Sequence, residues 1–196
     1  VGSHKGLYSD LILKNFNVNK VFMFEPQREI FTFIKKKYKN NKKIKLYNYA
    51  ASNYTKKKKI YINKHDLTSS LTKLNHENVY LKFKSKLFGG SIKKMIANSY
   101  KVQTIKLIDL IKKEKIKNID LLKIDTEGHE LEVLLGLGKE IQIIQIILIE
   151  FHNDNIYLNY SNNKIHNYLL KRNFFLQKKI KFPFTEWEDR IYINDN

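Results

Sequence analysis

The chain has 196 residues, 42% of them hydrophobic and 29% charged, which suffices for one ordinary domain with a buried core. It contains no cysteine, so disulfide frameworks, thiolate zinc sites and cysteine nucleophiles are excluded. The formal net charge of +18 is typical of proteins that meet phosphates, anionic membranes or acidic glycans. Only Arg28, Arg172 and Arg190 carry the guanidinium that binds phosphate in a bidentate manner, so the charge supports a nucleic-acid partner only weakly.

The sequence carries no clear targeting or membrane signal. Its longest apolar run, Ile143 to Phe151, is interrupted by Gln145 and Glu150 and is too short to cross a bilayer. No signal peptide is visible, although the first residue is Val1 rather than Met. We therefore expect a cytoplasmic protein without a transmembrane segment.

The first elements alternate between helical and strand patterns. A helical pattern covers Leu7 to Phe16, and the apolar run Val21 to Phe24 predicts a buried strand that ends at Glu25. Pro26 suits the first turn of a second helix. The apolar stripe of that helix comprises Ile30, Phe33, Ile34 and Tyr38.

A long excursion follows the next two strands. We predict a strand at Ile44 to Tyr49, ending at Ala50-Ala51-Ser52, and an exposed strand at Lys59 to Asn63. From residue 64 to residue 100 the periodicity weakens, and Gly89-Gly90 lies in the middle. This segment is expected to form a lid with a short helix, which could close over a substrate.

The second half repeats the alternation more clearly. Strands are predicted at Val102–Lys106, Ile119–Ile124 and Ile143–Ile149, and the last is branched almost throughout, as is typical of burial on both faces. A helix follows each strand, and the residues expected to face inward are Leu107, Leu110, Ile111, Leu131, Leu134, Leu135, Ile165, Tyr168 and Leu169.

Local signals define the ends of the last elements. Gly136 and Gly138 are expected to end the second of these helices in a left-handed conformation, and Ser161 is expected to cap the third. The chain then finishes with a predicted antiparallel pair at Phe174 to Ile180 and Arg190 to Ile193.

This order of elements predicts one α/β domain over residues 1–196, with a mostly parallel, doubly wound sheet and a C-terminal antiparallel strand pair. Such sheets bind ligands beyond the carboxyl ends of their strands, where the strand order reverses. The chemically distinctive residues of this chain follow predicted strands, so we look for a site at that edge.

Two features suggest a nucleoside-containing cofactor. Gly2 and Gly6 flank a turn that enters a helix, which offers close backbone approach and free amides. Glu25 follows the next strand about 20 residues later, where dinucleotide folds hold a ribose diol. A tight turn and a carboxylate at a helix N-terminus are the alternative interpretations.

The densest group of proton-transfer residues follows the strand at Ile119 to Ile124. Asp125 and Glu127 are candidates for catalysis, although both could simply cap the next helix. Lys123 lies inside the strand and needs an ionic partner, which Asp125, Glu127 or Glu150 could provide.

His152 follows the next strand and could act over the same cleft as a general base. A solvated surface histidine is the alternative. A metal held by Asp125, Glu127, His129 and His152 is conceivable, but no recognisable ligand spacing is present, so we expect no metal.

Several motifs together resemble the FkbM-type methyltransferases, and they occur in the family's order over nearly the whole chain. They are Val1 to Gly6, Phe24-Glu25-Pro26, Ala50-Ala51-Ser52, Ser69-Ser70-Leu71, Val102 to Ile105 with Leu107 to Leu110, and Lys123 to Glu132. The last of these is the most specific. The resemblance implies a Rossmann-like class I enzyme that uses S-adenosylmethionine (S-adenosyl-L-methionine) and methylates a hydroxyl of a sugar or natural product.

The resemblance also assigns roles to individual residues. Gly2, Ser3 and Gly6 would line the methionine part of the cofactor, and Glu25 with Pro26 would hold its ribose. The other expected contacts are Ala51 and Ser52 near the adenine, Asp125 and Glu127 at the reacting centre, and Ser69, Ser70 and His129 at the acceptor. Within the lid, the aromatic residues that could stack on a sugar, or simply anchor the loop, are Tyr80, Phe83, Phe88 and Tyr100.

The chain departs from the family pattern at three points. His4 replaces an Asn of the glycine turn, and Ile108 replaces the first acid of an L-D-D-L motif. The acidic residue that usually precedes Val1 is not in this chain, and we expect the start of the first strand to lie upstream.

The sequence is compatible with three functions. The first is an O-methyltransferase acting on a sugar, glycan or related small molecule. The second is an RNA-directed methyltransferase, which the positive charge suggests and which predicts binding that weakens steeply with salt. The third is a non-catalytic binding or assembly module, which the departures at His4 and Ile108 suggest.

Overall fold

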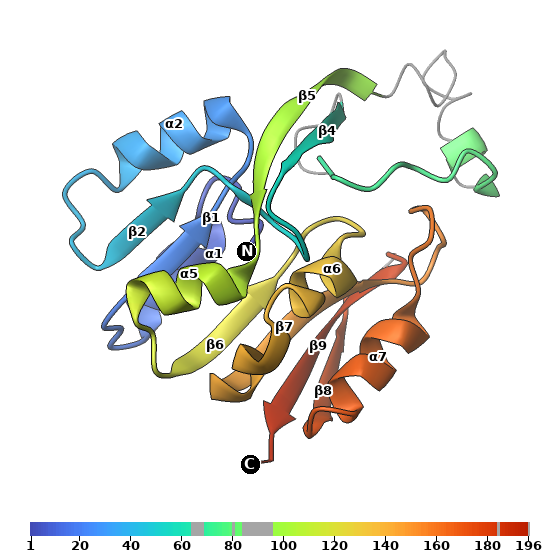
Figure 1. The fold of residues 1–196 in the computed structure, drawn as a ribbon. Coiled ribbons are helices and arrows are strands. Elements are labelled where there is room, and N and C mark those ends of the chain that lie inside the picture. Colours follow the sequence, from blue (N-terminus) through green and yellow to red (C-terminus); the bar gives the residue numbers. More distant parts are fainter. Residues whose placement is uncertain (64–68, 80, 84–95, 184, 196) are drawn as a thin grey trace.

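The computed structural model describes residues 1–63, 69–79, 81–83, 96–183 and 185–195 (Figure 1). Helices and strands alternate through most of this chain. In order they are α1 (Leu7–Asn15), β1 (Val21–Phe24), α2 (Arg28–Lys37), β2 (Ile44–Tyr47), β3 (Ala50–Ala51), β4 (Lys57–Asn63), β5 (Ile96–Ile105), α5 (Leu107–Glu114), β6 (Ile119–Ile124), α6 (Glu130–Leu135), the 3-10 helix η2 (Gly138–Ile143), β7 (Ile144–His152), α7 (Asn162–Leu170), β8 (Phe174–Lys181) and β9 (Trp187–Asn194).

The strands form sheets of mixed direction. β1 and β2 pair in parallel, β5 lies between β3 and β4, and the largest sheet has the order β6-β7-β9-β8. The pairs β4–β5, β7–β9 and β8–β9 are antiparallel. The α/β class and the C-terminal antiparallel pair are therefore confirmed. A single, mostly parallel sheet is not what the pairing shows, because β4 runs back along β5 and β9 inserts between β7 and β8.

The first residues of the chain lie between two of these sheets. The Val1 nitrogen donates to the Lys123 carbonyl over 2.8 Å, and the Asp125 N–H donates to the Val1 carbonyl over 3.2 Å. On the other side, the Ser3 N–H donates to the Phe24 carbonyl over 3.0 Å. These bonds join β1 to β6 and bring the carboxyl ends of both strands together.

The main core lies between the largest sheet and the helices α5, α6 and α7, which cover the face turned to the viewer in Figure 1. Ile124 of β6 and Ile147 of β7 are fully buried, as are Val133 of α6 and Leu169 of α7. Burying each such side chain contributes roughly 1.5–3 kcal/mol to folding. The core therefore fixes β6 and β7 rigidly, and both strands end at the site described below.

Several expected helix details are wrong. Phe33 is 52% exposed and Leu135 is 42% exposed, so both lie outside the buried stripes of α2 and α6, which are narrower than the apolar sequence pattern. Pro26 precedes Gln27, the N-cap of α2, rather than lying in its first turn. Gly136 has a right-handed φ of −69°, and the left-handed conformation occurs at Gly138, whose φ is 55°.

The expected lid divides into parts. Its last residues, from Ile96 onward, belong to β5, which pairs with β4 between Ile96 and Gln103, so this part is a two-stranded arm. Phe83 is exposed, and the hydroxyl of Tyr100 accepts from the N–H of Arg28. Residues 64–68, 80 and 84–95, including Tyr80 and Phe88, lie outside the described residues.

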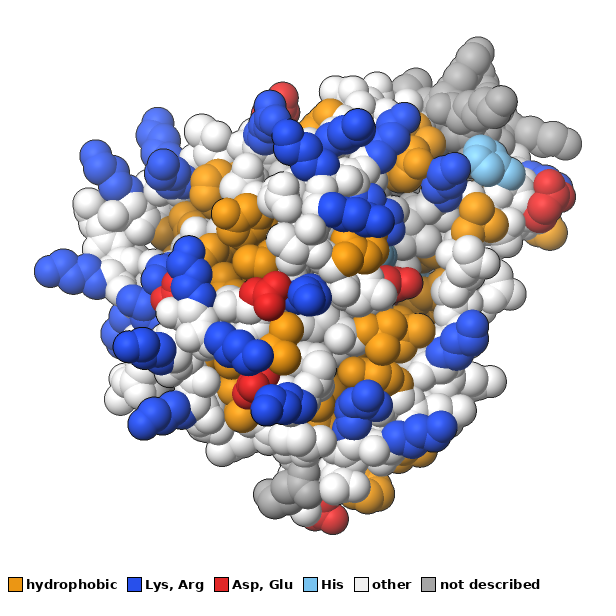
Figure 2. Space-filling view, viewed as in Figure 1, with side chains coloured by type: hydrophobic (Ala, Val, Ile, Leu, Met, Phe, Trp, Pro, Cys, Tyr) orange, Lys and Arg blue, Asp and Glu red, His pale blue; other side chains and the backbone are white. Residues whose placement is uncertain are grey.

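Lysine and arginine side chains are spread over the face shown in Figure 2, with apolar and uncharged atoms between them. On this face the positive charge does not gather into one stripe of the kind that tracks a nucleic-acid backbone. Among the described residues, no helix has both the length and the apolar character needed to cross a membrane.

Candidate active site

The glycine turn is built for close backbone contact. Gly2 has a φ of 76°, and a Cβ atom there would lie 1.7 Å from the Asp125 carbonyl oxygen. Gly6 has a φ of 78°, and its Cβ would lie 2.3 Å from the Tyr38 hydroxyl. Between them, the Ser3 hydroxyl donates to the Phe24 carbonyl over 3.1 Å. Only glycine permits this path, which brings the turn against the ends of β1 and β6.

Glu25 follows β1 and faces this turn. Its carboxylate accepts from the N–H of His4 over 2.9 Å and from the N–H of Gln27 over 2.8 Å. Burial raises the pKa of Glu25 to about 7, although these two donors act in the opposite direction. Each oxygen keeps a lone pair for a further donor. His4 has a φ of 42°, a region in which Asn and His are enriched, so His4 can replace the Asn of the family pattern.

Ser52 and His129 form a buried link between β3 and α6. The Ser52 hydroxyl lies 3.0 Å from Nε2 of His129, and both residues are almost completely buried, as is Ala51. Burial lowers the pKa of His129 to about 3, with a smaller contribution from the charge of Lys58, so this imidazole is neutral. The Ser52 hydroxyl is thus already engaged by His129.

Lys123 is paired with Asp125. The ammonium donates to the Asp125 carboxylate over 2.7 Å. Burial alone would lower the pKa of Lys123, but the carboxylate outweighs this effect and raises it. Of the ionic partners considered for this strand lysine, Asp125 is the one that binds it. Asp125 therefore forms an ion pair next to the groups described below, and its role in catalysis stays a prediction.

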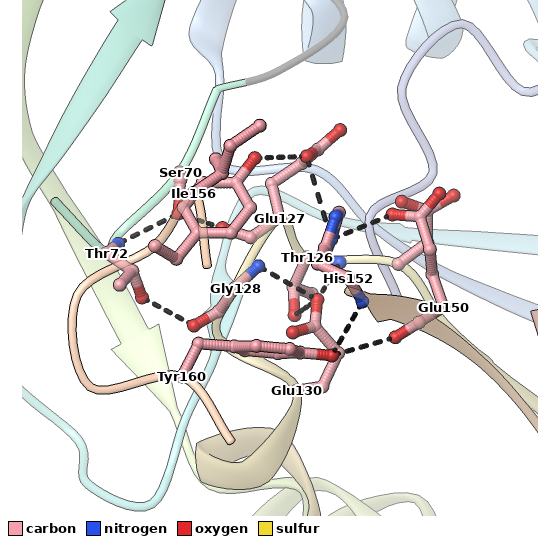
Figure 3. Close-up of polar contacts among 12 residues, drawn as sticks. Ser70, Thr72, Thr126, Glu127, Gly128, Glu130, Glu150, His152, Ile156 and Tyr160 are labelled. Carbon is pink, nitrogen blue, oxygen red and sulfur yellow. Dashed lines mark hydrogen bonds and ion pairs between the residues drawn. The ribbon is translucent and has the colours of Figure 1, made fainter. Parts of the chain in front are cut away.

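An acid–histidine cluster, formed by Glu127, Glu150 and His152, lies at the carboxyl ends of β6 and β7 (Figure 3). Nε2 of His152 lies 3.2 Å from the Glu150 carboxylate and 4.0 Å from that of Glu127. The Tyr157 hydroxyl donates to the Glu127 carboxylate. The Tyr160 ring packs against His152 at 5.5 Å between ring centroids. All these side chains are largely buried.

The members of the cluster differ in their pKa values and therefore in their protonation states. Burial raises the pKa of Glu127 to about 8, and the charge of Glu150 adds to this effect. Burial alone would lower the pKa of His152, but the surrounding carboxylates, led by that of Glu150, raise it to about 9. At neutral pH His152 is positively charged beside Glu150, whereas Glu127 titrates just above neutrality, where a general base is most effective.

Glu130 holds the loop that carries Glu127. Its Oε1 accepts from the N–H of Thr126 over 2.9 Å, from the Thr126 hydroxyl over 3.0 Å and from the N–H of Gly128 over 3.2 Å. This arrangement stabilises left-handed φ angles of 55° at Glu127 and 87° at Gly128. The Glu127 side chain is therefore directed toward His152 by a fixed backbone.

A second segment crosses the same loop. The Ser70 hydroxyl donates to the Glu127 carbonyl, and the Thr72 hydroxyl donates to the Gly128 carbonyl over 2.8 Å. The Ser69 hydroxyl donates to the Gln27 side chain over 3.4 Å, next to Glu25. The segment from Ser69 to Thr72 thus connects the Glu25 side of the site with the cluster.

The structure brings together Glu127 and His152, which the sequence nominated. It adds Tyr157, Tyr160 and Glu130, which sequence reasoning missed. For Glu150 one signal was available in the sequence. Residues two apart in a strand share a face, so Glu150 and His152 had to lie together. Tyr157 comes from a loop, and no periodicity indicates its direction.

One ligand atom from each member of the cluster lies within 4.8 Å of the others, a spacing that could also hold a metal ion. The absence of a metal from this site therefore stays a prediction, which chelation with EDTA tests.

The family of the chain follows from comparison with known proteins. Residues 1–176 match the Methyltransferase FkbM domain, which is most of the chain. The chain belongs to the FkbM methyltransferase family. Its fold is also similar to that of the crystal structure of the methyltransferase FkbM from Methylobacillus flagellatus KT, with a TM-score of 0.57 and 16% identity over 98% of this chain and 41% of that chain.

A curated relative of this FkbM domain is the hexuronic acid methyltransferase AglP of Haloferax volcanii. It is 32% identical over 63 residues, which cover 32% of this chain and 26% of AglP. The chain thus spans about a quarter of that relative.

Proposed function

We propose that this FkbM domain is an S-adenosylmethionine-dependent O-methyltransferase that acts on a hydroxyl of a sugar or glycan. The proposal rests on the position of Glu127 beside His152. Both lie next to the turn at Gly2, where a Cβ atom would collide with the Asp125 carbonyl. Family membership and the name of the relative AglP support the reaction and the acceptor class. The net charge of +18 is the one feature that favours an RNA acceptor instead.

The residues of the turn fit the proposed cofactor. Gly2 and Gly6 let the turn pack directly against Asp125 and Tyr38, and Glu25 presents a buried carboxylate with lone pairs to spare. Glu25 would accept the two ribose hydroxyls, and Gly2 with Ser3 would lie along the methionine part. Bound here, S-adenosylmethionine would supply a methyl group on a positively charged sulfur atom.

The cluster provides the other requirement of methyl transfer to oxygen, a place for the proton. The Glu127 carboxylate would take the proton of the acceptor hydroxyl while the hydroxyl oxygen bonds to the methyl carbon and the carbon–sulfur bond breaks, which leaves S-adenosylhomocysteine. Tyr157 donates to Glu127 and fixes its orientation. His152, held by Glu150, places a positive charge beside the carboxylate and favours its ionised form.

We expect S-adenosylhomocysteine to bind one-to-one in calorimetric titration, and Glu25→Ala to weaken this binding about 10- to 100-fold. This is the loss of one hydrogen bond to a charged group, about 1.5–3 kcal/mol, so it is the minimum expected if Glu25 accepts both ribose hydroxyls. Glu29→Ala, an exposed carboxylate in the first turn of α2, is the matched control and should bind as the native chain does. Equal binding by Glu25→Ala would contradict the proposed ribose contact, and no binding to the native chain would contradict the proposed function.

The same titration has a pH dependence that follows from Glu25. Ribose hydroxyls donate to the ionised carboxylate, so affinity should rise as pH increases from 6 toward 8, through the pKa of about 7. Below that pKa, affinity should fall by up to about tenfold per pH unit. The dependence should disappear in Glu25→Gln, which cannot ionise.

Methyl transfer should survive chelation. The carboxylates around His152, led by Glu150, raise its pKa to about 9, so a metal ion would have to displace a proton from this imidazole at neutral pH. Initial rates measured before and after incubation with EDTA should therefore agree within a factor of about two. Activity that EDTA abolishes and Mg²⁺ or Mn²⁺ restores would assign the cluster to a metal instead.

A further inference from the structure

A cavity of about 310 Å³ adjoins the acid–histidine cluster. It lies between β4, the start of α6 and the start of α7, and Gly128 and Tyr160 form its boundary with the cluster. The ring of Tyr160 packs on His152, so the cavity is one aromatic ring away from the groups that would accept the proton. The volume is at the small end of the range for ligand sites, about 300–1,000 Å³.

The charge on the cavity wall is positive. Lys58, Lys59 and Lys73 line it, against a single carboxylate from Glu132. In the part of the chain that the structure describes, none of these three lysines forms an ion pair. The cavity also reaches Ser161, the N-cap of α7, where the helix dipole adds positive potential.

The rest of the wall can contact the apolar face of a ring. Tyr61, Leu131 and Leu158 line the cavity beside the lysines. Leu158 is 40% exposed although it is a large apolar residue, so its surface is available to a ligand. Nζ of Lys59 lies 5.6 Å from the centroid of the Tyr61 ring, which keeps this ammonium close to the cavity. A ligand with one anionic group and one apolar ring face matches this combination.

We propose that this cavity binds an anionic sugar residue of the acceptor, with its acidic group facing Lys58, Lys59 and Lys73. The inference rests on the proposed function, because it assigns the bound sugar to the methyl acceptor. A sugar carboxylate and a sugar phosphate share the required chemistry, since Lys recognises either as a point charge.

The test measures sugar binding directly, with S-adenosylhomocysteine present and absent. Methyl β-D-glucuronide, methyl β-D-glucoside and glucose 6-phosphate are titrated against the native chain by ligand-observed NMR. We expect the glucuronide or the phosphate to bind at least about tenfold more tightly than the neutral glucoside. A variant with Lys58→Gln, Lys59→Gln and Lys73→Gln should lose this preference, since each exposed charge pair contributes a few-fold. Lys117→Gln, before β6 and outside the cavity lining, is the matched control.

Each outcome has a distinct meaning. Preference for the glucuronide identifies a sugar acid, and preference for the phosphate identifies a sugar phosphate. Equal binding of all three sugars, or a preference that the triple variant retains, would overturn the inference. Binding of S-adenosylhomocysteine in the same samples tests the proposed function separately, so an intact cofactor site without anion preference would reject only the inference. Retained cofactor binding also shows that the triple variant is folded.

Discussion

Replacing Glu127 by Gln is expected to lower kcat by about 10²- to 10⁴-fold, the usual contribution of a general base. The amide keeps the shape of the side chain and can still accept from Tyr157, but it cannot take a proton. Binding of S-adenosylhomocysteine should be unchanged. Single-turnover methyl transfer on a glycan panel measures the effect. The matched control, Glu140→Gln in η2, removes a carboxylate remote from the cluster and should leave the rate unchanged.

The pH profile distinguishes a base from a merely structural carboxylate. Because burial raises the pKa of Glu127 to about 8, kcat of the native chain should rise with pH from 6 through 8 and level off only above about pH 9. The residual rate of Glu127→Gln should lack this rise. A loss smaller than tenfold, or about 1.4 kcal/mol, would remove Glu127 from the mechanism. The parallel variants Asp125→Asn and His152→Ala would then show which other group accepts the proton.

Replacing Gly128 by Ala is expected to destabilise the fold by about 2–5 kcal/mol. A Cβ there would lie 2.3 Å from the Tyr157 ring, and the φ of 87° is unfavourable for any L side chain. Left-handed strain costs about 1–2 kcal/mol and overpacking about 1–3 kcal/mol. The displaced ring would also carry the Tyr157 hydroxyl away from Glu127, so kcat should fall as well. Urea unfolding and the methyl transfer rate measure the two effects.

Gly138→Ala is the matched control for this change. Gly138 has a comparable positive φ of 55°, but its Cβ would meet only the tip of Ile108 at 3.2 Å. It should therefore lose about 1–2 kcal/mol from backbone strain and keep its methyl transfer rate. If both glycine variants lost the same stability and activity, the contact between Gly128 and Tyr157 would have no special role.

Features defined by neighbouring residues could be predicted from the sequence. The strand Ile119–Ile124 has the predicted bounds, and Ser161 caps α7 by accepting from the N–H of Lys164. Phe33 shows the limit of this reasoning, since an apolar residue next to a buried stripe can face solvent at no large cost. The insertion of β9 between β7 and β8 was not predictable either, because the alternation of a strand does not indicate which strands lie beside it.

The candidate site shows the same division. Glu25, Glu127 and His152 were nominated because they follow strands, and the carboxyl ends of β1, β6 and β7 meet at one edge. The sequence therefore indicated which residues lie at this edge and which strand each of them follows. The pairing of Lys123 with Asp125 was one of several options, and only the folded geometry selects it. The contact of Tyr157 with Glu127 depends on the path of a loop, which local sequence does not specify.

The hydrogen bonds that join Val1 and Ser3 to β6 and β1 make the proposed cofactor turn part of the sheet architecture. Binding and folding then share the same residues and are thermodynamically linked. A ligand that orders this turn should also hold β1 and β6 in register. Part of its binding free energy would then stabilise these two strands. A substitution at Gly2 would for the same reason change affinity and conformational stability together.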